Sequence, residues 1–153
     1  MSERVPDVEI RPATQADGTA VVALWRAAGL TRPWNDPDRD FADALVTATS
    51  TVLVAHGPGG IDGTAAGDDR AVVGSVMAGF DGHRGWLYYL AVAPEARGQG
   101  LGRELVVAAE AWLAGQGAPK VQLMMRRENA DVQAFYAALG YEDADCVVLG
   151  RRF

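Results

Sequence analysis

A short glycine-rich segment, Gly98-Gln99-Gly100-Leu101-Gly102, is the feature that most constrains the fold of this chain. It follows segment 86–92, which is apolar at successive positions and is therefore typical of a central strand covered on both faces. It precedes a stripe of apolar residues at helical spacing, which predicts a helix over about 101–115. The chain is therefore expected to pass from a buried strand through a tight turn directly into a helix.

A glycine turn between a strand and a helix predicts an anion-binding site. The first N–H groups of a helix lack intrahelical partners, and the helix dipole places about half a positive charge there. Glycine lets the backbone approach a phosphate closely, and Arg97 adds a cationic side chain just before the turn. A tight turn that binds no ligand is the alternative interpretation.

The spacing of the glycines excludes two common phosphate-binding motifs. The dinucleotide fingerprint requires a third glycine where this chain has Arg103. The nucleoside-triphosphate loop requires Gly-Lys-Ser/Thr, whereas Gly102 is followed here by Arg103-Glu104.

The rest of the chain alternates between strand-like and helix-like segments and predicts a mixed α/β sheet. Thr14, Asp36 and Asn129 are candidate helix caps. Residues 57–70, rich in glycine, are interpreted as a long hairpin loop, either a lid or a tolerated insertion. The expected elements are, in order, a strand at 8–11, helices at 15–28 and 37–46, strands at 51–55, 71–80 and 86–92, a helix at 101–115, a strand at 121–125, a helix at 130–139, and one or two strands formed by Tyr141 and residues 146–149.

Length and composition restrict the class of protein. The 153 residues fit a single domain, 1–153, and the net charge of −6 argues against binding to nucleic-acid backbones. No apolar run is long enough to span a membrane and no secretory leader is visible, so a soluble cytoplasmic protein is expected. Cys146 lies in an apolar run and is expected to be buried, and neither His56 nor His83 has neighbours at metal-ligand spacing, so no metal is expected.

The arrangement Arg97-x-x-Gly100-x-Gly102 resembles the acetyl-CoA pyrophosphate motif of the GNAT superfamily of N-acetyltransferases. Segment 90–98 is similar to the strand and loop that carry this motif in the family. Asn129 and segments 134–136 and 139–141 resemble the family's distal helix.

The resemblance covers roughly residues 8–151, and segments 32–37 and 79–85 additionally look like the YpeA-type branch of the family. It implies an α/β (α+β) GNAT-like fold. In that fold a mixed, mostly antiparallel sheet of six to seven strands has a V-shaped splay and is flanked by about four helices.

The resemblance also implies an acetyl-CoA-dependent N-acyltransferase that moves the acetyl group directly to a primary amine in a ternary complex. Leu90, Ala91 and Val92 would pair with the pantetheine arm, and Asn129 would contact the ligand, although a plain helix cap is its alternative role. Tyr136 would donate a proton to the CoA thiolate, with a core position as its alternative. The implied pyrophosphate-binding residues are Arg97, Gly98, Gln99, Gly100, Leu101 and Gly102.

Several residues are candidates for binding the amine and for accepting its proton. Asp81, His83 and Glu95 are candidates for the general base, and His83 has a suitable ordinary pKa. In similar proteins the segment around Trp34 borders the acceptor site, and an aromatic ring near Asp36 suits a cationic amine. Structural roles in turns and helix caps are the alternatives for these side chains.

Two other functions fit the same motif. One is an acyltransferase that uses a different acyl-CoA, and the other is a CoA-binding sensor or interaction module without turnover. The expected partners are acetyl-CoA and an amine, carried by a small molecule or a protein. Neither nucleic acid nor a membrane is expected, and a homodimer is a further candidate assembly by analogy with similar proteins.

Overall fold

The computed structural model describes residue 5, residues 7–58 and residues 70–153, and the chain divides into two compact units, Met1–Leu123 and Met124–Phe153. The loop expected at 57–70 falls mainly on residues 59–69, outside the described residues. The second unit contains α4 (Ala130–Ala138). The elements of the first unit are β1 (Glu9–Pro12), η1 (Gln15–Asp17), α1 (Gly18–Ala27), α2 (Pro37–Val46), β2 (Ser50–Pro58), β3 (Arg70–Phe80), β4 (Gly85–Val92), η2 (Pro94–Ala96), α3 (Leu101–Gly115) and β5 (Val121–Leu123), where η denotes a short 3-10 helix.

The described strands form one sheet in the order β1-β2-β3-β4-β5. Neighbours are antiparallel from β1 to β4, whereas β4 and β5 are parallel and are connected through α3, so the predicted mixed α/β sheet is confirmed. No described helix has the length and apolar character needed to cross a membrane.

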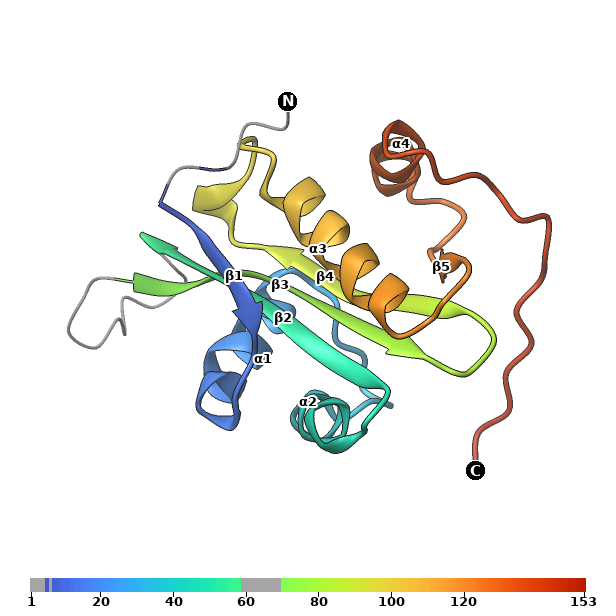
Figure 1. Ribbon diagram of the computed structural model, residues 1–153, viewed down its shortest axis with the longest axis horizontal. Helices are drawn as coiled ribbons and strands as arrows, with labels where there is room; N and C mark the ends of the chain where they lie inside the picture. The colour runs from blue at the N-terminus through green and yellow to red at the C-terminus, as the bar shows by residue number, and fades with distance from the viewer. Residues whose placement is uncertain (1–4, 6, 59–69) are drawn as a thin grey trace. The chain divides into compact units, whose positions relative to one another are not determined.

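Helices cover both faces of the sheet, with α3 on one face and α1 and α2 on the other (Figure 1). Successive residues of β3 illustrate this arrangement, because side chains alternate between faces along a strand. Gly74 faces α3, since a Cβ added to this glycine would lie only 2.8 Å from the side chain of Leu105 in that helix. On the opposite face the hydroxyl of Ser75 accepts a hydrogen bond from the indole of Trp25 in α1, at 2.9 Å. Both partners of this bond are fully buried.

The expected six to seven strands are not found, because the sheet in the described part of the chain has five. The missing strands are those expected at Tyr141 and residues 146–149, which belong to no strand. Asp145 has a positive φ of 53°, and its N–H donates to the carboxylate of Asp143 at 2.8 Å. This local turn takes the backbone out of the extended conformation just before the apolar run.

The apolar run at the C-terminal end is exposed, with 91% of Leu149 accessible to solvent. Cys146, expected to be buried, is also exposed, and its thiol donates to the carbonyl of Ala144 at 3.2 Å. An apolar run becomes a buried strand only where a neighbouring strand supplies backbone partners, and composition alone does not reveal that neighbour.

The second unit is organised around α4, whose ends match the sequence prediction. The side-chain oxygen of Asn129 accepts the N–H of Val132 at 3.3 Å, which makes Asn129 the N-cap. Gly140 follows the helix with a φ of 91°, as a left-handed stop requires. Tyr136 is the buried residue of α4, and its ring meets that of Tyr141 edge-on at a centroid distance of 5.4 Å.

A β-bulge interrupts β4 and redirects one of its side chains. Ser75 of β3 pairs with Ala91, and Met77 pairs with Tyr88, so the single residue between them on β3 faces two residues of β4. One of these two, Tyr89, has a φ of 53°, a left-handed conformation that is costly for an aromatic residue. Surrounding contacts must therefore hold Tyr89 in place.

Contacts from α1 and α2 hold this residue. The ring of Tyr89 stacks on the buried ring of Trp25, with a centroid distance of 3.9 Å and an interplanar angle of 8°. Its hydroxyl donates to the carboxylate of Asp40 in α2 at 2.7 Å. Burial first, and then this hydrogen bond, raise the pKa of Tyr89 well above its usual value, so the phenol stays protonated at neutral pH.

A double-mutant cycle tests whether the bond between Tyr89 and Asp40 supports the fold. Tyr89→Phe and Asp40→Ala should show a favourable coupling of about 1–3 kcal/mol in the free energy of unfolding, because the bond has a charged acceptor. Urea denaturation of the two single variants and the double variant measures this coupling. Tyr88→Phe combined with Asp40→Ala is the matched control and should give a value near zero; the same result for Tyr89 would contradict the assignment.

Candidate functional site

The turn between β4 and α3 has the backbone conformation that its glycines predict. The chain passes through η2 and Arg97, and then through Gly98 and Gly100, whose φ angles are 78° and 83°. A Cβ added at either glycine would meet nothing within 4 Å, so the space outside the turn is open. Glycine is required here because the backbone is left-handed, and crowding is not the reason. Open space next to a glycine backbone leaves room for a ligand to approach.

The N-terminus of α3 offers free backbone donors at this turn. Gly100 is the N-cap and supplies no side chain to the helix end, and the first intrahelical bond runs from the N–H of Glu104 to the carbonyl of Gly100 at 3.1 Å. The N–H groups of Leu101, Gly102 and Arg103 precede that bond and point out of the helix end. Together with the helix dipole they attract an anion.

Two charged side chains near the turn are positioned by other contacts. The guanidinium of Arg97 donates through Nε to the carbonyl of Val92 at 3.2 Å, which keeps it beside the last residue of β4. The carboxylate of Glu104, in the first turn of α3, accepts the N–H of Val5 at 2.6 Å. Arg97 therefore adds positive charge at the turn, and Glu104 directs its negative charge toward another part of the backbone.

The strand β4 extends beyond its parallel neighbour. Only Gly85, Trp86 and Leu87 pair with β5, so β4 continues from Tyr88 to Val92 past the end of that strand. An extended ligand with amide groups can pair with the backbone of a strand at such a position.

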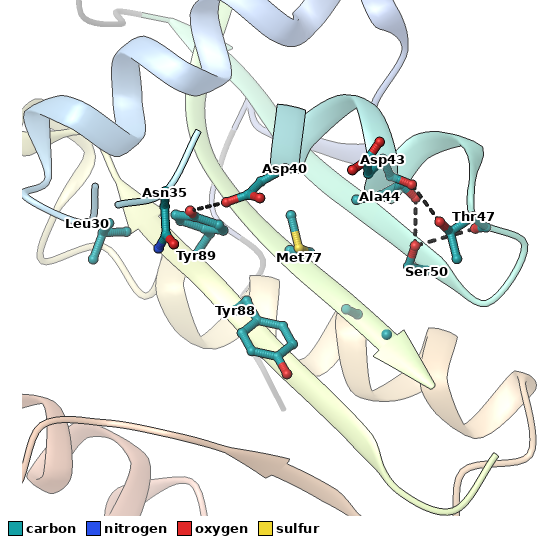
Figure 2. Close-up of a pocket in the computed structure, with 12 residues that line it drawn as sticks. Leu30, Asn35, Asp40, Asp43, Ala44, Thr47, Ser50, Met77, Tyr88 and Tyr89 are labelled. Carbon is teal, nitrogen blue, oxygen red and sulfur yellow. Dashed lines mark hydrogen bonds between the residues drawn. The ribbon is translucent and has the colours of Figure 1, made fainter. Parts of the chain in front are cut away.

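A pocket of about 510 Å³ lies between α2 and the strands β3 and β4, whose residues line it, and its volume is in the range of small-molecule sites. Asp40 lies beside Tyr89, and Asp43 lies nearer to Thr47 and Ser50 (Figure 2). Tyr88 lines the same pocket although it precedes Tyr89 directly in β4. The lining residues are Leu30, Asn35, Asp40, Asp43, Ala44, Thr47, Ser50, Met77, Ala78, Gly79, Tyr88 and Tyr89.

The bulge explains why two consecutive tyrosines reach one pocket, since neighbours in a regular strand point to opposite faces. The sequence interpretation missed both tyrosines and also missed Asp40 and Asp43. A signal for the carboxylates was present, because residues three apart lie on one face of the helix begun at Pro37. No signal for the bulge exists in the residues of β4 alone.

The acceptor-side residues proposed from the sequence lie at several places. Asn35, next to Trp34, lines the pocket, whereas Trp34 is not among the lining residues and is 53% exposed. Asp81 and His83 lie in the exposed turn between β3 and β4, outside the pocket lining, and Glu95 lies in η2 and is exposed.

Asp81 organises the turn in which it lies. Its carboxylate accepts the N–H groups of Arg84 and His83, at 2.7 and 2.8 Å, and the indole N–H of Trp86 at 3.1 Å. These bonds, that of Arg84 first, lower the pKa of Asp81. A carboxylate that accepts three such bonds has a clear structural role in the turn.

Asn129 and Tyr136 belong to the second unit. Asn129 caps α4, and burial raises the pKa of Tyr136 to about 12. The phenol of Tyr136 is therefore protonated at neutral pH and can donate a hydrogen bond. Within the described residues, no group of three or more His, Cys, Asp or Glu side chains is placed to hold a metal ion.

Solved structures with the same fold include acetyltransferases with CoA bound. The aminoglycoside N-acetyltransferase AAC(6')-Iy in complex with CoA matches with a TM-score of 0.77 and 18% identity, over 99% of each chain. The aminoglycoside 6'-N-acetyltransferase AAC(6')-Ih of Acinetobacter baumannii matches with a TM-score of 0.73 and 19% identity, over 95% of this chain and 98% of that one. At these identities the likeness establishes the fold.

Sequence comparison gives the family. An acetyltransferase of Pectobacterium atrosepticum is 43% identical over 145 residues, and one of Yersinia enterocolitica is 41% identical over 145 residues; each alignment covers 95% of both chains. The model of the acetyltransferase (GNAT) family matches residues 19–141, which include the glycine turn, β4 and the pocket-lining helix α2. Together with the uncapped N-terminus of α3, these matches show that the chain belongs to the GNAT family of acetyltransferases.

Proposed function

We propose that this protein, as one domain spanning residues 1–153, transfers an acetyl group from acetyl-CoA directly to a primary amine in a ternary complex. The observation that carries the proposal is the arrangement of three features along β4. The strand borders the pocket at Tyr88 and Tyr89. At Leu90–Val92 it continues past its pairing with β5, while its other edge stays paired with β3, and it then leads into the glycine turn. Both substrates can therefore meet along one strand.

The donor side of the site is formed by the glycine turn. The N–H groups at the start of α3 and the side chain of Arg97 would hold the pyrophosphate of CoA, as the family motif implies. Leu90, Ala91 and Val92 would pair with the pantetheine amides. At about 3.3 Å per residue, the strand covers roughly 10 Å between Tyr89 and Val92, which separates the phosphate end from the pocket. AAC(6')-Iy, a protein of the same fold, forms a complex with CoA, which supports CoA as a ligand of this chain.

The reaction requires the acceptor amine in its neutral form. The nitrogen lone pair attacks the thioester carbonyl, a C–N bond forms, and collapse of the tetrahedral intermediate breaks the C–S bond. The nitrogen then loses one proton, the sulfur leaves as a thiolate, and a proton finally reaches that sulfur. The products are the amide and free CoA, and no covalent enzyme intermediate is needed, so the exposed Cys146 takes no part.

Tyr136 would stabilise the leaving thiolate. Its pKa of about 12 lies above the value of about 8.5 that is typical of a thiol, so complete proton transfer from the phenol to sulfur would be uphill. A protonated phenol is nevertheless a good hydrogen-bond donor to a developing negative charge. We therefore assign Tyr136 the role of a donor to sulfur, with the proton on sulfur supplied in the end by the amine.

Release of free thiol from acetyl-CoA in the presence of a panel of primary amines tests the function. At least one amine should accelerate thiol release in proportion to enzyme, and mass spectrometry should find the acetylated amine. Tight CoA binding without thiol release from any amine would instead favour a sensor or interaction module. A faster reaction with another acyl-CoA, such as succinyl-CoA, would show that the acyl group is not acetyl.

A pair of glycine variants tests the donor site. Gly100→Glu places a carboxylate at the uncapped N-terminus of α3 and should weaken CoA binding at least about 100-fold, which is roughly 2.7 kcal/mol. Gly117→Glu is the matched control, since Gly117 also has a positive φ (96°) and open space but lies beyond the other end of the same helix. Calorimetric titration with CoA measures both, and equal affinities in the two variants would remove the turn from the site.

A tyrosine variant tests the leaving-group role. Tyr136→Phe should lower kcat about 100-fold with little change in the affinity for CoA, because the hydrogen bond to sulfur is strongest in the transition state. Tyr141→Phe removes a phenol from the same unit and should keep kcat within a few-fold. A Tyr136→Phe enzyme with full kcat would assign this ring to packing alone.

A further inference from the structure

The pocket beside α2 carries a charge pattern that selects among amines. Asp40 and Asp43 are the charged residues of its described lining, which includes no lysine, arginine or histidine. A cavity with this lining attracts cations and repels a ligand that carries a carboxylate or phosphate. Its volume of about 510 Å³ suits a small molecule.

The two carboxylates belong to different parts of the pocket lining. Asp40 accepts the hydroxyl of Tyr89 at 2.7 Å and is thereby tied to β4, the strand along which the acyl donor would lie. Asp43 lies one helical turn further on, toward Thr47 and Ser50 (Figure 2). Asp43 forms an ion pair with Arg39 at 3.5 Å, where both side chains are mostly exposed and the pairing is therefore weak.

Two negative charges three residues apart on one helix face repel each other, and their Cβ atoms are separated by about 5–6 Å. A ligand with two ammonium groups would relieve this repulsion, with one cation near each carboxylate. The methylene groups between the cations would lie against the apolar lining, which includes Met77 and Ala78. The rings of Tyr88 and Tyr89 in the same lining favour cations further.

We propose that the acceptor is a small dicationic amine, such as a short aliphatic diamine, whose reacting amino group is placed by Asp40 and whose second ammonium is bound by Asp43. This inference rests on the proposed function and names the substrate class of the same site. In this proposal Asp40 positions the reacting amino group at the part of the pocket next to β4, where that group, once deprotonated, would face the thioester. Asp43 recognises the cation that does not react.

Three amines with the same four-carbon chain test the proposal. These are 1,4-diaminobutane, butylamine and 4-aminobutanoate, which place an ammonium, a methyl and a carboxylate at the far end. With acetyl-CoA, kcat/KM for the diamine should exceed that for butylamine at least about tenfold, or roughly 1.4 kcal/mol, and 4-aminobutanoate should be the poorest substrate. Equal kcat/KM values for the diamine and butylamine would overturn the proposal.

Variants on α2 connect the selectivity to particular side chains. Asp43→Asn should reduce the ratio of kcat/KM for diamine over butylamine to within about threefold, because it removes the charge that binds the second ammonium. Asp38→Asn is the matched control: it removes the same charge from the same helix, at an exposed residue outside the pocket lining, and should keep the ratio of the unmodified protein. A ratio unaffected by Asp43→Asn would also overturn the proposal.

Direct binding separates this inference from the proposed function. Calorimetric titration of the CoA-loaded protein with the three amines reports selectivity whether or not turnover occurs. If no amine releases thiol while the diamine still binds preferentially and loses that preference in Asp43→Asn, the acetyl-transfer proposal fails and the binding inference stands. If thiol release occurs with butylamine or a lysine-containing peptide as readily as with the diamine, the transfer proposal stands and the dicationic acceptor is wrong.

Discussion

The stack of Trp25 on Tyr89 is the interaction on which the rest of the site depends. It holds an aromatic residue of β4 in a left-handed backbone conformation and therefore stabilises the bulge in that strand. The bulge brings Tyr88 and Tyr89 to the same pocket, and the hydroxyl of Tyr89 fixes Asp40. Packing between α1, α2 and β4 thus determines the shape and charge of the pocket that we propose as the acceptor end of the site.

The other end of β4 depends on a different physical principle. There the site consists of backbone groups, since the N-terminus of α3 has no side-chain cap and two glycines with positive φ lead into it. Backbone amides provide a local positive field without requiring a basic protein. A chain with a net charge of −6 can therefore attract a polyanionic ligand at one point while presenting carboxylates to a cation at another.

The parts of the molecule that the sequence predicted are those governed by local rules. Helix caps, left-handed glycines and the apolar stripe of α3 depend on neighbouring residues, so the glycine turn, the cap at Asn129 and the stop at Gly140 were foreseen. The family match supports the motif-based interpretation of the turn. The roles of Asn129 and Tyr136 toward CoA stay predictions.

The parts that the sequence did not predict depend on contacts between distant segments. Asp40 and Asp43 look like ordinary surface residues of a helix until α2 packs against the sheet, and the bulge at Tyr89 requires Trp25 from another element. The apolar run at 146–149 was expected to form a strand, but the turn at Asp143–Asp145 precedes it and the run is exposed. Apolar composition indicates a tendency to pair and does not specify the partner.

The central claim is that backbone amides at the start of α3 bind CoA next to β4, and NMR titration of the ¹⁵N-labelled protein with CoA tests it most directly. The account predicts that the largest amide shift changes, saturating together, occur at Gly98, Gly100 and Gly102 and continue along β4 at Leu90–Val92. Shift changes concentrated elsewhere in the chain, with the amides of the glycine turn unaffected at saturating CoA, would contradict it.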